Sequence, residues 1–413
     1  MLPPANNLIP ELNILPDSVA ATPRSTAKPE VNIKPIMLNR WQSFWVMRRI
    51  RWHLFRLVLG KVRNPLKTIW ALRRLIQIRR EYLGDFAFKK VAKVDNRYFF
   101  EYNTPGWPSQ AFDDYHLAEL NRIVPFQHKP YVFKNVIVAI TKKCALRCEH
   151  CFEWDVLNQK EKLTLADLQT IVRQFQEQGV GQLQFSGGEP LLRMPALLTL
   201  LKTAQPGTDF WVLTSGHLLT LETAQALKQA GLTGVTISLD HIEPHLHNQF
   251  RGFAEAYNWV EKAAFNANQA GLVVGFSLCA TKEFVTTDNL LAYASLVSRL
   301  GGAFIQLLEP KAVGHYAGQA VGLSAAQRKM LEAFYTNLNY NPAYHHLPLV
   351  VYYDYQRRRA GCAGAADRHV YVDTDGQLHA CPFCQKPAGN MLEKNIAGSL
   401  ESLRQAGCPV LNT

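Results

Sequence analysis

The sequence predicts an α/β fold with a parallel sheet, arranged as an open or partial (β/α)6 barrel. From residue 134 onward, apolar β-branched runs alternate with segments of helical periodicity. Strands are expected at 135–140, 182–186, 210–214, 234–239, 272–278 and 303–308, and helices near 165–178, 191–204, 221–230, 253–270 and 288–300. Short loops joining six such units favour parallel strands connected by crossover helices. Binding sites in this class of fold lie where the strands end.

Local signals support these helix boundaries. Thr164 and Asp167 have the spacing of a capping box, which begins the first helix of the series. A glycine follows four of the expected helices, where a left-handed residue commonly ends a helix. These glycines are Gly179, Gly231, Gly271 and Gly301.

Composition divides the chain into four parts. Residues 1–35 contain seven prolines and little periodicity, which predicts a disordered tail. We expect a basic helical and hairpin extension at 36–130, the barrel at 131–310, and a linker helix with a small module at 311–413. The sequence shows neither a signal peptide nor an apolar run long enough to cross a membrane. The eight cysteines therefore indicate a cytoplasmic protein that keeps its thiols reduced.

The basic charge is concentrated in one stretch. Residues 36–85 carry twelve Lys or Arg against two acids, and so hold most of the net charge of +12. Two amphipathic helices are expected, at 41–59 and 66–82, separated by Gly60 and Pro65. We rank docking of these helices on the chain's own catalytic domain first. Peripheral contact with an anionic membrane through residues 40–82 comes second, and contact with nucleic acid is unlikely.

Two short elements connect this extension to the barrel. Residues 90–102 have the pattern of a β-hairpin that turns at Asp95 and Asn96. A short helical segment near 115–123 then leads to the first strand of the barrel.

Three cysteines directly follow the first barrel strand, with the spacing Cys144-x3-Cys148-x2-Cys151, and Phe152 comes next. Thiolates prefer soft metals and iron–sulfur clusters. Three ligands leave one position of a four-iron cluster open to a reactant. The alternatives are a zinc site, for which His150 is a further ligand, and a disulfide, which a reducing compartment disfavours.

This motif resembles the radical S-adenosylmethionine (SAM) superfamily. The resemblance implies that the three cysteines hold a [4Fe–4S] cluster and that SAM chelates its fourth iron. It further implies that an external electron donor of the flavodoxin or ferredoxin type reduces the cluster. Reductive cleavage of SAM then gives a 5′-deoxyadenosyl radical, which takes a hydrogen atom from the substrate.

Further residues at the strand ends match the family's cofactor-binding motifs. Gly187-Gly188-Glu189 resembles the motif that binds the SAM amino group, and Ser215 lies where the family has a polar residue. Ser238, Asp240 and Arg251 resemble a stretch found in enzymes that mature peptides or build molybdopterin. The resemblance assigns Ser238 to the ribose or carboxylate of SAM and Arg251 to its carboxylate, while Asp240 can equally cap the following loop. Phe152 completes the expected cofactor contacts.

Four cysteines near the C-terminus form a second candidate site. They are Cys362, Cys381, Cys384 and Cys408, and a hairpin around 374–376 precedes the Cys381–Cys384 pair. This pattern resembles the SPASM and Twitch modules, which hold auxiliary iron–sulfur clusters. Four ligands fit the single-cluster Twitch form better than the two-cluster SPASM form. Structural zinc is the competing interpretation.

These motifs predict a radical SAM oxidoreductase that modifies a peptide or protein. The alternative enzyme acts at a membrane surface on a lipid or small-molecule precursor. The alternative of another class is a non-catalytic iron–sulfur carrier or sensor, which would need no SAM pocket. The loop from Gln306 to Gly314, after the sixth strand, either faces the substrate or is a solvent-exposed turn.

Overall fold

The structure is a computed structural model that describes residues 34–84, 86, 90–126, 133–362, 368–393 and 396–406. Its centre is a nine-stranded sheet in the order β10-β9-β8-β7-β6-β5-β4-β11-β12. The six expected barrel strands are β4 (Asn135–Thr141), β5 (Gln182–Gly187), β6 (Asp209–Thr214), β7 (Leu232–Ser238), β8 (Val273–Cys279) and β9 (Phe304–Leu308). They are parallel neighbours in chain order, which confirms the predicted partial barrel.

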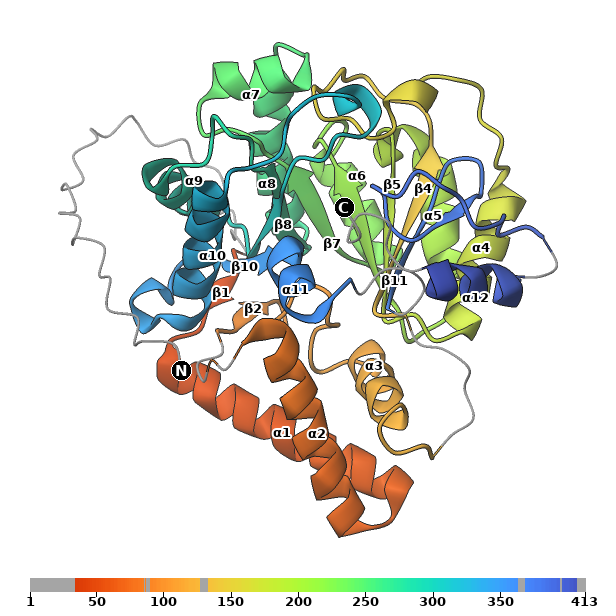
Figure 1. The fold of residues 1–413 in the computed structure, drawn as a ribbon, viewed down its shortest axis with the longest axis vertical. Coiled ribbons are helices and arrows are strands. Elements are labelled where there is room, and N and C mark those ends of the chain that lie inside the picture. The colour runs from red at the N-terminus through yellow and green to blue at the C-terminus, as the bar shows by residue number, and fades with distance from the viewer. Residues whose placement is uncertain are drawn as a thin grey trace. The chain divides into compact units, whose positions relative to one another are not determined.

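Crossover helices join these strands, as Figure 1 shows. They are α4 (Leu165–Glu177), α5 (Met194–Thr203), α6 (Leu221–Gln229), α8 (Ala256–Gln269) and α9 (Thr287–Arg299). The capping box at Thr164 and Asp167 is present. An additional helix, α7 (Pro244–Arg251), lies within a stretch that we expected to be a loop. Buried aliphatic and aromatic side chains of strands and helices form one continuous core.

The same sheet extends beyond the boundary predicted at residue 310. Helix α10 (Ala325–Tyr340) leads to β10 (Leu349–Tyr352), which pairs in parallel with β9. After α11 (Tyr353–Ala360), β11 (His369–Val372) pairs in parallel with β4 at the other side of the sheet. Strand β12 (Leu378–His379) then forms the expected hairpin with β11, and α12 (Ile396–Ala406) follows. The two ends of the sheet remain separate strands, so the barrel is open.

The N-terminal extension consists of two long helices, a short helix and a small sheet. These are α1 (Arg40–Val62), α2 (Pro65–Leu83), α3 (Gln110–Asn121) and the strands β1 (Ile36–Met37), β2 (Ala92–Val94) and β3 (Arg97–Phe99). The break expected at Gly60 was wrong, because α1 continues to Val62 and ends at Arg63 in a left-handed conformation. Pro65 occupies the first turn of α2, where its missing N–H costs nothing.

One side of α1 packs against the rest of this extension. Val46, Met47, Ile50 and Leu54 form a buried cluster with side chains that include Phe112 of α3. All of these side chains belong to the extension itself, so docking of α1 and α2 on the catalytic domain stays a prediction. No described helix has an apolar stretch long enough to cross a bilayer. Most of residues 1–35 lie outside the described part of the chain, so the predicted disordered tail stays a prediction.

Candidate metal and cofactor site

The three clustered cysteines lie in the loop after β4, at the carboxyl ends of the strands. Cys148 is buried, while Cys144 and Cys151 are partly buried. All three contact one small apolar cluster around Leu146 and Ala256. They also line a cavity of about 710 Å³. The same cavity is lined by Phe152, Gly187, Gly188, Glu189, Ser215, Ser238, Asp240 and Arg251. The fold thus brings all the predicted cofactor residues to one place.

The chemistry of the three thiols fits a cluster. Burial raises the pKa of Cys144 to about 11 and that of Cys151 to about 12, and it also raises the pKa of Cys148. Neutral thiols lose these protons when they bind a metal. Three thiolates can each bind a different iron of a [4Fe–4S] cluster, and zinc is the competing interpretation.

The two glycines of the second loop are required by its contact with the cysteine loop. Gly187 has φ +124°, and a Cβ atom there would lie 2.4 Å from the Thr141 carbonyl oxygen. At Gly188, a Cβ atom would lie 2.2 Å from the carbonyl oxygen of Lys143. The Gly188 and Glu189 amides donate to these two carbonyls, both at 2.7 Å. The two glycines therefore allow the close approach of this loop to the cysteine loop.

Glu189 lines the cavity, and the end of β6 holds its carboxylate. It accepts hydrogen bonds from the hydroxyl of Thr214 at 2.8 Å, the amide of Ser215 at 2.8 Å and the hydroxyl of Ser215 at 2.6 Å. Burial raises its pKa, while these hydrogen bonds lower it. Ser215 therefore positions Glu189, a role that its spacing in the sequence does not reveal.

Asp240 and Arg251 form a buried ion pair beside the cysteine loop. Arg251 Nη2 lies 2.5 Å from Asp240 Oδ2, and Nε of the same guanidinium donates to that oxygen at 2.6 Å. Nη1 of Arg251 lies 3.6 Å from the Cys148 sulfur. Asp240 also accepts from the Cys279 amide at 2.9 Å. The Arg251 guanidinium thus links β7 and β8 to the metal-binding loop.

Breaking this pair should strongly destabilise the protein. Replacing Arg251 with Met leaves the Asp240 carboxylate buried and uncompensated, which costs about 3–5 kcal/mol. The matched change Arg173→Met removes an exposed pair with Glu177, for which about 0–1 kcal/mol is expected. Urea denaturation of the two apoprotein variants measures the difference. A loss of stability at Arg251 no larger than that at Arg173 would contradict a structural role for the pair.

Residues after β9 also contact the cysteine loop. A Cβ atom at Gly314 would lie 2.3 Å from the Cys151 carbonyl oxygen. His315 donates its amide to that oxygen at 2.9 Å, and its ring stacks on Trp154 at 3.7 Å. The predicted substrate loop therefore also supports the metal-binding loop.

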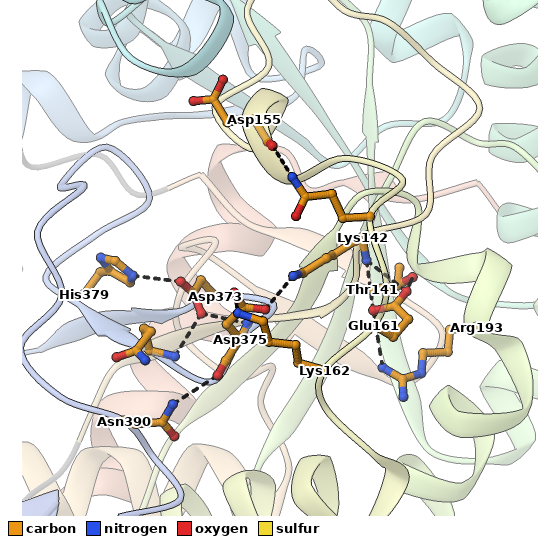
Figure 2. Close-up of polar contacts among 12 residues, drawn as sticks. Thr141, Lys142, Asp155, Glu161, Lys162, Arg193, Asp373, Asp375, His379 and Asn390 are labelled. Carbon is orange, nitrogen blue, oxygen red and sulfur yellow. Dashed lines mark hydrogen bonds and ion pairs between the residues drawn. The ribbon is translucent and has the colours of Figure 1, made fainter.

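A polar network joins the end of β4 to the C-terminal hairpin (Figure 2). Glu161 accepts from the Thr141 hydroxyl at 2.5 Å and from the Lys142 amide at 3.0 Å. The Lys142 ammonium, almost fully buried, lies 2.6 Å from the Asp375 carboxylate, which Lys162 also contacts at 2.7 Å. Burial raises the pKa of Asp375, but these two lysines lower it below its usual range. Sequence reasoning missed this link, because its members are far apart in the chain.

Two of the C-terminal cysteines, Cys381 and Cys384, directly follow the hairpin that this network holds. The Cys381 and Cys384 sulfurs are 3.4 Å apart, and the hydrogen bond between them helps to lower the pKa of Cys381 to about 7. Cys362 packs against the same core and lines the cavity with Cys381. Cys408 lies outside the described residues. The auxiliary site therefore stays a prediction, with three of its four expected ligands placed.

Comparison with known proteins identifies the core. Over residues 138–284, the chain matches the family described as the Radical SAM superfamily. This region contains the three clustered cysteines and the Gly187-Gly188-Glu189 loop. GTP 3′,8-cyclase of Xanthomonas campestris pv. campestris (strain 8004) is 30% identical over 210 residues, which are 48% of this chain and 62% of that enzyme. The enzyme of the same name from Xanthomonas axonopodis pv. citri is 27% identical, over 61% of this chain and 74% of that protein. The chain thus spans less than two thirds of the first relative.

A solved structure gives the same fold. Streptococcus suis SuiB bound to its precursor peptide SuiA has a TM-score of 0.52 with this chain at 15% sequence identity. The match covers 66% of this chain and 65% of SuiB. This likeness confirms the radical SAM partial barrel as the fold. The cofactors of that family are a [4Fe–4S] cluster and SAM, and the residues of the cavity fit both.

Proposed function

We propose that this protein is a radical SAM enzyme that takes a hydrogen atom from a substrate held in the barrel cavity. One observation carries the proposal: the three clustered cysteines, the Gly187-Gly188-Glu189 loop and the Asp240–Arg251 pair line a single cavity. The cluster, when bound, supplies the electron that cleaves SAM to methionine and a 5′-deoxyadenosyl radical. A non-catalytic electron carrier would not need these motifs around its cluster. Formation of 5′-deoxyadenosine by the reconstituted, reduced protein tests the proposal.

Each residue has a defined role in this proposal. Cys144, Cys148 and Cys151 bind three irons, and Glu189 accepts hydrogen bonds from the SAM ammonium group. Ser238 lines the cavity beside the cofactor. Arg251 is already bound to Asp240 and Cys148, so we assign it to holding the cysteine loop. The surrounding protein orients the cofactor and excludes water from the radical.

We further propose that Cys362, Cys381 and Cys384 bind an auxiliary cluster, with Cys408 as a fourth ligand. Cys362 and Cys381 line the same cavity as the first site, which supports a role close to the substrate. The network from Lys142 to Asp375 keeps the hairpin that precedes Cys381 tied to the end of β4. An external flavodoxin or ferredoxin is the proposed electron donor for the first cluster.

Two substrate classes follow from the sequence: a peptide or protein, and a lipid or small-molecule precursor at a membrane surface. The fold shared with peptide-bound SuiB supports the first class, and the relatives named GTP 3′,8-cyclase extend the second to nucleotides. A specific observation favours the membrane-surface class. The side of α1 that faces away from its buried stripe exposes Trp41, Trp45 and Trp52 to 74%, 55% and 62%.

This outer face of α1 should bind anionic membranes. Arg48 lies over the Trp45 ring at 5.5 Å, and exposed Arg49 and Arg56 flank the tryptophans. Tryptophan prefers the headgroup region, and each basic residue near an anionic surface is worth about 1 kcal/mol before screening. We expect the intact protein to sediment with phosphatidylserine vesicles at low salt and to dissociate as salt is raised.

Changing Trp41, Trp45 and Trp52 together to Ser should remove this sedimentation without changing the thermal midpoint, because all three side chains are exposed. Trp211 is buried in the core and is not a suitable control. The matched control is Phe253→Ser, an exposed aromatic at the other end of the sheet, which should leave binding unchanged. If the wild-type protein does not sediment with phosphatidylserine vesicles at low salt, the proposed membrane contact is contradicted.

A further inference from the structure

The cavity does not end at the cofactor residues. Its lining includes side chains of the barrel interior and side chains of α1 and α2, and we call the part lined by these two helices the arm. Figure 1 places these two helices at the opposite end of the sheet from α7, which follows the carboxyl end of β7. The seven residues of β4 alone span roughly 23 Å at about 3.3 Å per residue. A ligand that reaches from the cluster into the arm is therefore long.

The walls of the arm are aliphatic. Ile50 and Leu54 come from the buried stripe of α1, and Leu72 and Leu75 come from the facing side of α2, where they are partly buried. Side chains at this spacing share one side of each helix. Leu72 packs against the cluster that contains Ile50 and Leu54, and both Leu72 and Leu75 pack against Val58 and Ala71. The surface that this packing leaves lines the cavity.

The lumen has the opposite character. Polar side chains that line it include Gln184, Gln306, Ser238 and Ser277. Oε1 of Gln184 is buried and has no hydrogen-bond partner among the described residues. A ligand that fills the whole cavity must therefore be polar at the end near the cluster and apolar at the other end.

Two arginines also line the cavity. Arg79 belongs to the barrel-side end of α2, where Phe86 just beyond the helix stacks on Tyr340 at 4.2 Å. Arg79 lines the cavity, and its Nε is buried without a hydrogen-bond partner in the described part of the chain. Arg51 of α1 lines the cavity as well. A guanidinium with an unused donor is suited to a phosphate or carboxylate.

We propose that the arm binds the hydrocarbon chain of an anionic amphiphile, with its anionic group at Arg79 and its polar end in the lumen. This assignment rests on the proposed function, because it makes the amphiphile the substrate class of the radical reaction. The exposed tryptophans of α1 belong to the same pair of helices as the arm. A membrane-bound position would thus place the arm next to the source of such a ligand.

Hexadecyl phosphate, below its micelle concentration, tests the arm by calorimetric titration of the full-length reconstituted protein. Wild type should bind it at least tenfold more tightly than butyl phosphate, which lacks the long chain. Leu75→Trp fills the arm and should lower the affinity at least tenfold. Arg79→Gln should lower it roughly tenfold and remove the preference for hexadecyl phosphate over hexadecyltrimethylammonium. Gln77→Trp and Arg73→Gln, on the exposed side of α2, are the matched controls and should change neither value.

Two results would contradict binding of the hydrocarbon chain in the arm. One is that Leu75→Trp binds hexadecyl phosphate as tightly as wild type does, which would place the amphiphile on the outer face of the helices. The other is equal affinity of wild type for hexadecyl and butyl phosphate. SAM binding is measured in parallel and should be the same in all variants. If wild type does not cleave SAM but binds hexadecyl phosphate in an Arg79-dependent way, the proposed function fails and the arm stands as a binding site. If the protein cleaves SAM but does not bind hexadecyl phosphate, the proposal that the arm binds an amphiphile is contradicted, and the proposed function stands.

Discussion

Replacing Cys144, Cys148 and Cys151 with Ala should abolish SAM cleavage and remove about half of the protein's iron. Each cubane cluster holds four irons, so wild type is expected to contain about eight and the triple variant about four. The remaining iron belongs to the proposed auxiliary site, which depends on separate cysteines after β10. Iron analysis and Mössbauer spectroscopy of anaerobically reconstituted protein measure both clusters.

The matched control for this variant is Cys279→Ala. Cys279 is buried in β8 and lines the same cavity, but it is not part of the motif. It should keep the full iron content and the full rate of SAM cleavage. Unchanged cleavage in the triple variant would contradict the first site. If the triple variant contains zinc and no iron, the C-terminal cysteines form a structural zinc site and not a second cluster.

Glu189→Gln should weaken SAM binding roughly ten- to a hundredfold. A hydrogen bond to a charged group contributes about 1.5–3 kcal/mol, which corresponds to this range of affinity. The fold should tolerate the change. The carbonyl oxygen of Gln can accept from the Ser215 amide, and its NH2 group can donate to the Thr214 hydroxyl, which is 2.8 Å from the present carboxylate. Equilibrium dialysis of SAM with the cluster-loaded protein measures the effect.

Glu243→Gln is the control for loss of one negative charge. Glu243 is exposed and follows β7 at the same end of the sheet. It should leave SAM affinity unchanged. If Glu189→Gln binds SAM as tightly as wild type does, the Gly-Gly-Glu loop is an ordinary structural turn with no role in SAM binding. Its glycines would then serve only the contact with the cysteine loop.

Local patterns were sufficient to predict the order of the barrel elements. The strands from β4 to β9 are apolar runs between helices with clear caps, and parallel pairing of consecutive strands follows from the short connections. The motif residues at their ends could be placed at one rim for the same reason. The helix α7 was missed because Pro244-His-Leu-His has no apolar periodicity that separates it from a loop.

Contacts between distant residues could not be predicted in this way. Nothing near Arg251 indicates that its guanidinium reaches Cys148, more than a hundred positions earlier, and the link from Lys142 to Asp375 is longer still. The sheet also includes β10 and β11, which lie beyond the predicted boundary at residue 310. Burial of a charge and pairing at a sheet edge depend on tertiary packing, which a single sequence does not state.

The central claim is that the cavity beside the cysteine loop carries out reductive cleavage of SAM. The most direct test incubates the anaerobically reconstituted wild-type protein with SAM, with and without a low-potential reductant, and quantifies the products by mass spectrometry. We expect 5′-deoxyadenosine and methionine in equal amounts, formed only when the reductant is present. A protein that holds its full iron complement and binds SAM, but forms no 5′-deoxyadenosine after reduction, would contradict the account.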